Sequence, residues 1–337
     1  MPPKGFNPIF DVGDLAPMDI LRVVRRMQGT APLVVDHETV AGGQAVARDF
    51  LEYVRSCLRS LWPNSDEELG RLIGPVQLEF SRQDVSREQF VRELWNRRGI
   101  GMAFIESPTT YFATMCTLVE NLRIEETRSG AGQTLLSLGC GPGLYESYLA
   151  AVSGRVFGRT VFRFKCVDFA PGMIAAMKRV MKFTRREYNV GLKNLEAVLD
   201  DMTVLRQFPD KSVSQIFCNN SLQWVPDWQA VIRQFARVMD PKGARLVHLF
   251  IHPHTMTALE NDGSVILRLE DVPYDKLFDE LEANRFAICR TRQFAGREGS
   301  GQQGARANRL YVKAEFQPQG VKKSWHDADI SGALSLL

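Results

Sequence analysis

From residue 132 onward, short apolar runs alternate with segments of helical periodicity. The apolar runs predict buried strands, because a strand of a parallel sheet is covered on both faces and shows few polar positions. Runs of this kind occupy 133–140, 162–169, 194–201, 214–220 and 244–252. The segments between them predict helices over 144–153, 171–188 and 227–239. This alternation is typical of an α/β fold, a parallel sheet with helices on both faces.

The last third of the chain changes pattern. A helix is predicted at 273–283, followed by strands at 286–294 and 309–316 with no helix between them. A glycine-rich stretch joins these two strands, which therefore read as an antiparallel hairpin. Residues 317–337 show no clear periodicity and read as a tail.

The first 130 residues are helical in pattern and carry no strand signal. Helices are predicted at 14–28, 43–62, 65–74, 86–98 and 108–122. In the second of these, one stripe holds Val46, Phe50, Val54, Leu58 and Leu61, as expected of a helix with one buried face. We therefore expect a helical extension over 1–130, packed on or lidding a domain that covers 131–316.

Composition narrows the class of protein. The 337 residues are 45% hydrophobic and 24% charged, as in an ordinary globular protein. The net charge of +3 is too small to imply a nucleic-acid partner. No apolar stretch reaches the roughly 18 residues of a membrane helix, and the first residues lack a signal-peptide core. The six cysteines form no Cys-x-x-Cys pair, so we expect a reduced, cytoplasmic chain with no metal site.

The most informative segment is Leu135-Leu-Ser-Leu-Gly-Cys-Gly-Pro-Gly-Leu144. A strand runs into a glycine-rich turn that opens a helix, which lets a ligand lie against bare backbone and unpaired N–H groups. A dinucleotide-binding loop would need G-x-G-x-x-G, but Leu144 stands at the third glycine position. A P-loop is excluded because no Gly-Lys-Ser/Thr follows. The loop suits a ligand with an amine and a carboxylate better than a diphosphate.

This segment resembles motif I of the class I S-adenosylmethionine-dependent methyltransferases. The resemblance implies a Rossmann-like sheet closed by an antiparallel edge hairpin, with S-adenosylmethionine as the cofactor. The cofactor contacts implied along the loop are Gly139, Cys140, Gly141 and Gly143.

Carboxylates end the second and third predicted strands. Asp168, at the tip of the second, faces the ligand crevice of an open α/β sheet, where it can accept both hydroxyls of a ribose; a helix N-cap is the alternative. Phe169 and Met173, which follow it, are also assigned to the cofactor. The resemblance implies that Asp201 meets the adenine amino group and that Met202 packs on the adenine.

The fourth predicted strand runs into Cys218-Asn-Asn-Ser-Leu-Gln-Trp-Val-Pro-Asp-Trp228. With Arg237-Val-Met-Asp-Pro-Lys-Gly243, this segment resembles the subgroup of trans-aconitate, malonyl-carrier and quinone C-methyltransferases. Asn219 is assigned to the cofactor, and Gln223 and Trp224 to the substrate. The subgroup usually has an aspartate before strand four, where this chain has Ser214, and Lys242 replaces a glycine. These departures indicate a diverged branch, so the subgroup does not define the substrate.

Candidates on the acceptor side come from three segments. His252 and His254 follow the fifth strand and share one parity, so they are candidate catalytic residues; solvent-facing loop positions are the alternative. His248, inside the strand, reads as a core histidine. The resemblance assigns Tyr111 to the methionine end of the cofactor; the alternative is a half-buried tyrosine packed under the lid. Tyr145 is a weaker candidate for the substrate.

These observations favour methyl transfer to a small-molecule acceptor, by O- or C-methylation, in secondary or cofactor metabolism. Two alternatives stay open: a cofactor-binding enzyme of another reaction, such as a cyclisation or rearrangement, and a non-catalytic scaffold. A nicotinamide enzyme is disfavoured by Leu144. No nucleic-acid or membrane partner is expected, and a homodimer stays open.

Overall fold

The structure is a computed structural model. It describes residues 41–61, 91–93, 95–96, 99–101, 103, 108–123, 133–157, 162–251, 256–259, 265–269, 272, 274–295 and 308–321. The predicted helices at 14–28 and 65–74, and most of the tail at 317–337, lie outside these residues.

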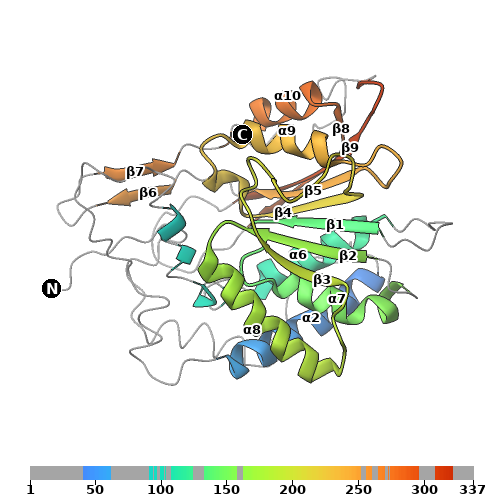
Figure 1. The fold of residues 1–337 in the computed structure, drawn as a ribbon, viewed down its shortest axis with the longest axis vertical. Coiled ribbons are helices and arrows are strands. Elements are labelled where there is room, and N and C mark those ends of the chain that lie inside the picture. The colour runs from blue at the N-terminus through green and yellow to red at the C-terminus, as the bar shows by residue number, and fades with distance from the viewer. Residues whose placement is uncertain are drawn as a thin grey trace.

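A seven-stranded sheet forms the centre of the fold, in the order β3-β2-β1-β4-β5-β9-β8 (Figure 1). Its strands are β1 (Gln133–Leu138), β2 (Phe162–Asp168), β3 (Leu195–Leu199), β4 (Gln215–Asn219), β5 (Leu246–Ile251), β8 (Phe286–Ala295) and β9 (Asn308–Phe316). The pairs among β1 to β5 are parallel, whereas β9 pairs antiparallel with both β5 and β8. The predicted parallel sheet with an antiparallel edge hairpin is confirmed.

The strand order reverses at β1, because the chain goes from β1 outward through β2 to β3 and then returns to β4 on the other side. In open α/β sheets, ligands bind outside the carboxyl ends of the strands at such a switch point. The segments that follow β1 and β4 are therefore placed side by side where a ligand is expected.

Helices cover both faces of the sheet and enclose two apolar cores (Figure 1). One core lies under α2 (Ala41–Ser60), α6 (Pro108–Asn121), α7 (Leu144–Phe157) and α8 (Pro171–Tyr188). The other lies under α9 (Trp228–Val238) and α10 (Tyr274–Ala283). Strand β1 serves both: Leu135 packs in the first core and Leu136 in the second, as alternating side chains of a buried strand must.

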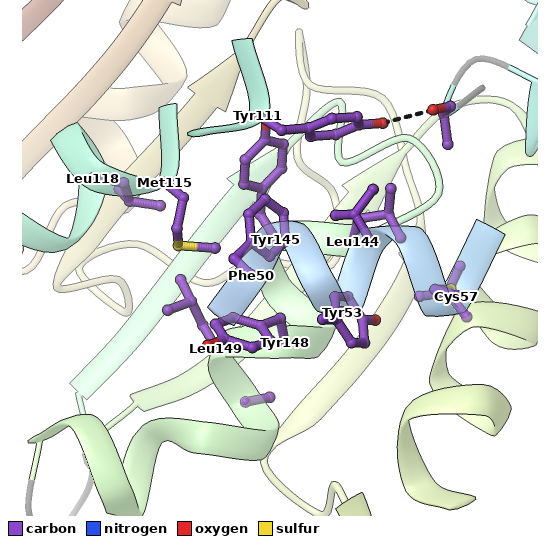
Figure 2. Close-up of a cluster of buried hydrophobic side chains, with 14 of the residues drawn as sticks. Phe50, Tyr53, Cys57, Tyr111, Met115, Leu118, Leu144, Tyr145, Tyr148 and Leu149 are labelled. Atoms are coloured by element: carbon purple, nitrogen blue, oxygen red, sulfur yellow. Dashed lines mark hydrogen bonds between the residues drawn. The ribbon is translucent and has the colours of Figure 1, made fainter. Parts of the chain in front are cut away.

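Helix α2 is an integral part of the first core, because its buried side chains belong to the same apolar cluster as those of α7, α8 and the sheet. Its Phe50 is fully buried, and the ring centroid lies 4.9 Å from that of Tyr145 and 5.3 Å from that of Tyr148, both on α7 (Figure 2). Tyr53 donates or accepts a 2.8 Å hydrogen bond with Thr184 of α8. The apolar stripe predicted for this helix therefore faces the sheet domain.

Some elements were not predicted. A two-stranded antiparallel hairpin, β6 (Met256–Leu259) with β7 (Val265–Leu269), follows β5, and a short 3-10 helix, η1 (Leu222–Trp224), follows β4. Of the helix expected at 86–98, the structure describes helical residues 91–93 and 95–96. In the described part of the chain, no helix has the length and apolar character needed to cross a membrane.

Candidate cofactor site

The glycine loop after β1 is held by its neighbours on both sides. All three glycines have a positive φ, +60° at Gly139, +54° at Gly141 and +65° at Gly143. Residues with a side chain rarely adopt this backbone conformation. A Cβ on Gly139 would lie 2.3 Å from the Ser221 Oγ, and one on Gly143 would lie 2.6 Å from the Met177 Cγ. A Cβ on Gly141 would meet no atom within 4 Å. Gly141 is therefore the point where the loop backbone faces open space.

Asp168, at the end of β2, lies directly against this loop. Its Oδ2 accepts a hydrogen bond from the Gly141 N–H at 3.0 Å, and its Oδ1 accepts one from the Ala170 N–H at 3.0 Å. Burial raises the pKa of this carboxyl to about 6, against the opposing effect of these N–H donors. Each oxygen keeps a lone pair, so the carboxylate can still accept two hydroxyl groups.

The end of β3 carries the two adjacent carboxylates. Asp200 is committed to the local turn, because its oxygens accept from the backbone N–H groups of Asp201 and Gln207. The Asp201 Oδ1 accepts from both the N–H and the hydroxyl of Thr203 at 2.8 Å. Met202 is buried, and its Cε would lie 3.2 Å from a Cβ on Gly139. Thus Met202 joins the β3 tip to the glycine loop.

The segment after β4 supplies buried polar atoms without partners. The Asn220 Oδ1 and the Gln223 Oε1 are buried and have no hydrogen-bond partner among the described residues. The Asn220 backbone has a φ of +52°, and its N–H donates to the Phe250 carbonyl at 2.8 Å. The Ser221 hydroxyl lies 3.0 Å from the Gly139 carbonyl oxygen, to which it donates. Buried acceptors of this kind require a donor, so this end of the sheet is incomplete without a polar ligand or water.

A short N-terminal segment encloses the site, and the sequence did not reveal it. The Arg92 guanidinium lies 5.7 Å from the centroid of the Phe169 ring, and Trp95 meets Trp224 edge to face at 4.8 Å. The Asn96 Oδ1 accepts from the Gly172 N–H at 3.0 Å, at the start of α8.

The one sequence signal for this approach is a glycine in the first turn of α8. A Cβ on Gly172 would lie 2.2 Å from the backbone oxygen of Asn96, so only glycine allows the two segments to touch.

The remaining predicted site residues are placed as follows. Tyr111 is buried in the aromatic cluster of Figure 2, where its hydroxyl donates to the Ala103 carbonyl at 3.0 Å, and the centroid of the Tyr145 ring lies 5.8 Å from its own. Met173 is buried in the first turn of α8. His252 and His254 lie outside the described residues. His248 is fully buried, which lowers its pKa to about 3, and the prediction of a core histidine is confirmed.

These residues fit the cofactor that motif I implies. The loop presents bare backbone at Gly141, a carboxylate with free lone pairs stands beside it, and Asn220 and Gln223 offer unpaired oxygens across the switch point. A ribose, a purine and an amino-acid group together supply hydroxyls and N–H donors for such acceptors.

The fold and the loop define a Rossmann-like nucleoside-binding domain, and part of it matches a known family of domains. Residues 136–247 match the model of the methyltransferase domain family. These residues, about a third of the chain, thus carry the features of a class I S-adenosylmethionine-dependent methyltransferase domain.

Individual proteins are similar over part of the chain. The malonyl-[acyl-carrier protein] O-methyltransferase of Halorhodospira halophila is 32% identical over 93 residues, which are 28% of this chain and 28% of that protein. Among solved structures, a SAM-dependent methyltransferase of Methanosarcina mazei covers 59% of this chain and 96% of its own, at 17% identity and a TM-score of 0.42. Phosphoethanolamine N-methyltransferase 2 of Haemonchus contortus covers 70% and 61%, at 13% identity and a TM-score of 0.49.

Proposed function

We propose that this protein transfers a methyl group from S-adenosylmethionine to a small-molecule acceptor, by O- or C-methylation, in secondary or cofactor metabolism. The observation that carries the proposal is the open backbone at Gly141 beside the Asp168 carboxylate. A cytoplasmic location and the lack of a nucleic-acid partner are part of the same proposal.

The residues of the chain have three tasks in this reaction. Asp168 binds the ribose hydroxyls while its two backbone contacts hold it in place. The unpaired oxygens of Asn220 and Gln223 accept from the ligand and so orient it across the switch point. Trp95 and Trp224 meet at the edge of the cofactor site, which we call the rim. Both side chains are more than nine-tenths buried and exclude water from it. S-adenosylmethionine supplies an activated methyl group, so alignment in a dry pocket is most of what the protein must provide.

Acceptor chemistry decides whether a base is needed. The Halorhodospira relative is named for transfer to oxygen of a malonyl group on a carrier protein, and a carboxylate acceptor requires no proton removal. A phenol or carbon acceptor would require it, and we propose His252 or His254 as the base in that case. Turnover that survives removal of both imidazoles would reject this role.

Cofactor binding is tested by calorimetry with S-adenosylmethionine and S-adenosylhomocysteine. Asp168→Asn keeps the shape of the side chain and removes its charge. Two hydrogen bonds to a charged acceptor are worth about 3 kcal/mol together, so we expect affinity to fall about 100-fold. Asp200→Asn, at the neighbouring strand tip, is the matched control and should bind as the wild type does. Equal affinities for all three proteins would contradict the assignment of Asp168.

The reaction type is tested with methyl-labelled cofactor and a panel of carboxylate, phenol and activated-carbon acceptors. Label in the acceptor together with release of S-adenosylhomocysteine supports methyl transfer. Consumption of an acceptor without release of S-adenosylhomocysteine indicates the alternative of a cyclisation or rearrangement. Failure of the folded wild type to bind the cofactor would leave the scaffold alternative.

A further inference from the structure

A buried carboxylate lies directly behind the glycine loop. Glu146 stands in the first turn of α7, three residues after Gly143, and its side chain is 2% exposed. Its Oε1 accepts a hydrogen bond from the Ser137 Oγ of β1 at 2.5 Å. Its Oε2 is buried and has no hydrogen-bond partner among the described residues. An unpaired carboxylate oxygen in a protein interior is unfavourable unless a cation or donor reaches it.

The groups that face Glu146 are neutral. Besides Ser137 of β1, they are Cys140 of the glycine loop, Cys166 of β2 and Tyr53 of α2, and the charge of Glu146 contributes to raising the pKa of each of these three. Burial raises the pKa of Glu146 itself to about 7, opposed only by the bonds from Ser137 and from its own backbone N–H. No cation among the described residues contributes. The ionised carboxylate therefore lacks a counter-charge in this part of the chain.

The glycine loop connects the two members of the Ser137–Glu146 pair. Ser137 lies two residues before Gly139, and Glu146 lies three after Gly143. If Asp168 takes the ribose, the amino-acid end of the cofactor comes over this loop, towards β1 and α7. That end carries an ammonium group, and the sulfonium lies three carbons away.

We propose that Glu146 is the buried counter-charge for the ammonium group of the cofactor. The inference rests on the proposed function, since it needs a cofactor with an amino-acid end. The competing role is structural: Glu146 serves only as the acceptor that ties α7 to Ser137.

The test compares wild type and Glu146→Gln with three ligands. S-adenosylmethionine carries ammonium and sulfonium, S-adenosylhomocysteine carries the ammonium only, and 5′-methylthioadenosine carries neither. Glutamine keeps an acceptor for Ser137 and removes the charge. Loss of a buried charge partner should lower the affinity for the first two ligands by at least about tenfold. The affinity for methylthioadenosine should not change.

The other outcomes overturn the proposal. Unchanged affinities for all three ligands would show that Glu146 is only the Ser137 acceptor. Lower affinity for all three ligands would show that the substitution distorts the pocket. Lower affinity for S-adenosylmethionine alone would show that Glu146 interacts with the sulfonium and not with the ammonium group. If wild type binds methylthioadenosine but neither amino-acid ligand, Glu146 has no ammonium partner. If it binds none of them, the proposed function itself fails.

Proton release provides a second readout that needs no variant. Wild-type protein is titrated at pH 6 in two buffers of different ionisation heat. An ammonium beside Glu146 favours the ionised carboxylate, so binding of S-adenosylhomocysteine should release protons that binding of methylthioadenosine does not. The pKa of Asp168 is also raised to about 6, but Asp168 contacts the ribose, which both ligands carry. Its contribution to proton release is therefore the same for both and cancels in the difference. Equal proton release with the two ligands would overturn the proposal.

Discussion

Replacement of Phe50 by alanine should destabilise the sheet domain, although Phe50 belongs to the N-terminal region. Its ring is fully buried among four tyrosines, on α2, α6 and α7, at centroid distances of 4.9 to 6.1 Å (Figure 2). Truncation of a buried phenylalanine costs about 3–5 kcal/mol. Unfolding entropy scales as about 2.1 cal/mol/K per residue. For 337 residues, the melting temperature should fall by about 4–7 °C.

Differential scanning calorimetry measures this shift, and the number of transitions is as informative as their position. Because α2, α7 and α8 share one core, a single transition should move as a whole. Arg48→Ala, an exposed position on the same helix, is the matched control and should change stability by less than about 0.5 kcal/mol. A Phe50→Ala profile in which the main transition keeps its wild-type temperature would refute the reasoning.

Two further predictions concern the rim and the sheet. Gly172→Ala should cost about 1–3 kcal/mol in denaturant unfolding, because its Cβ would lie 2.2 Å from the Asn96 carbonyl oxygen. Gly191→Ala, whose nearest contact is 3.7 Å, should cost less, and equal losses would contradict the close approach.

The pKa of His248 is lowered to about 3, first by burial, so between pH 6.5 and 3 the unfolded chain binds a proton that the native protein does not. Wild type should therefore lose up to about 1.4 kcal/mol per pH unit relative to His248→Gln as the pH falls below 6.5. The raised pKa of Glu146 acts in the opposite direction but is common to both proteins, and a flat difference curve would disprove the assignment.

The sheet and its helices could be predicted because their signals are local. The run Leu135-Leu-Ser-Leu138 is fully buried in β1, and Pro171 begins α8 where a missing N–H costs nothing. The edge hairpin followed from two strands without a helix between them. The β6–β7 hairpin was missed although Asn261-Asp-Gly-Ser264 between its strands is a turn signal, because the four residues of β6 are too few to show a clear alternation.

The site was predictable only along the motifs. Asp168 and the three glycines could be found because strand ends at a switch point converge in any open α/β sheet. Trp95 and Asn96 reach the rim through tertiary packing, which no pattern within residues 86–98 encodes. The unpaired oxygen of Glu146 is likewise a property of the folded interior, since an isolated glutamate in a helix start usually stabilises the helix dipole in water.

The Trp95–Trp224 pair gives this protein an optical signal of its own. Two indoles that meet edge to face at 4.8 Å couple their electronic transitions. Coupling of the strong far-ultraviolet transition of indole produces paired circular dichroism bands of opposite sign. One indole comes from the N-terminal segment and the other from the end of β4, so any movement between them changes the bands. The contact between these two segments can therefore be followed in solution without a label.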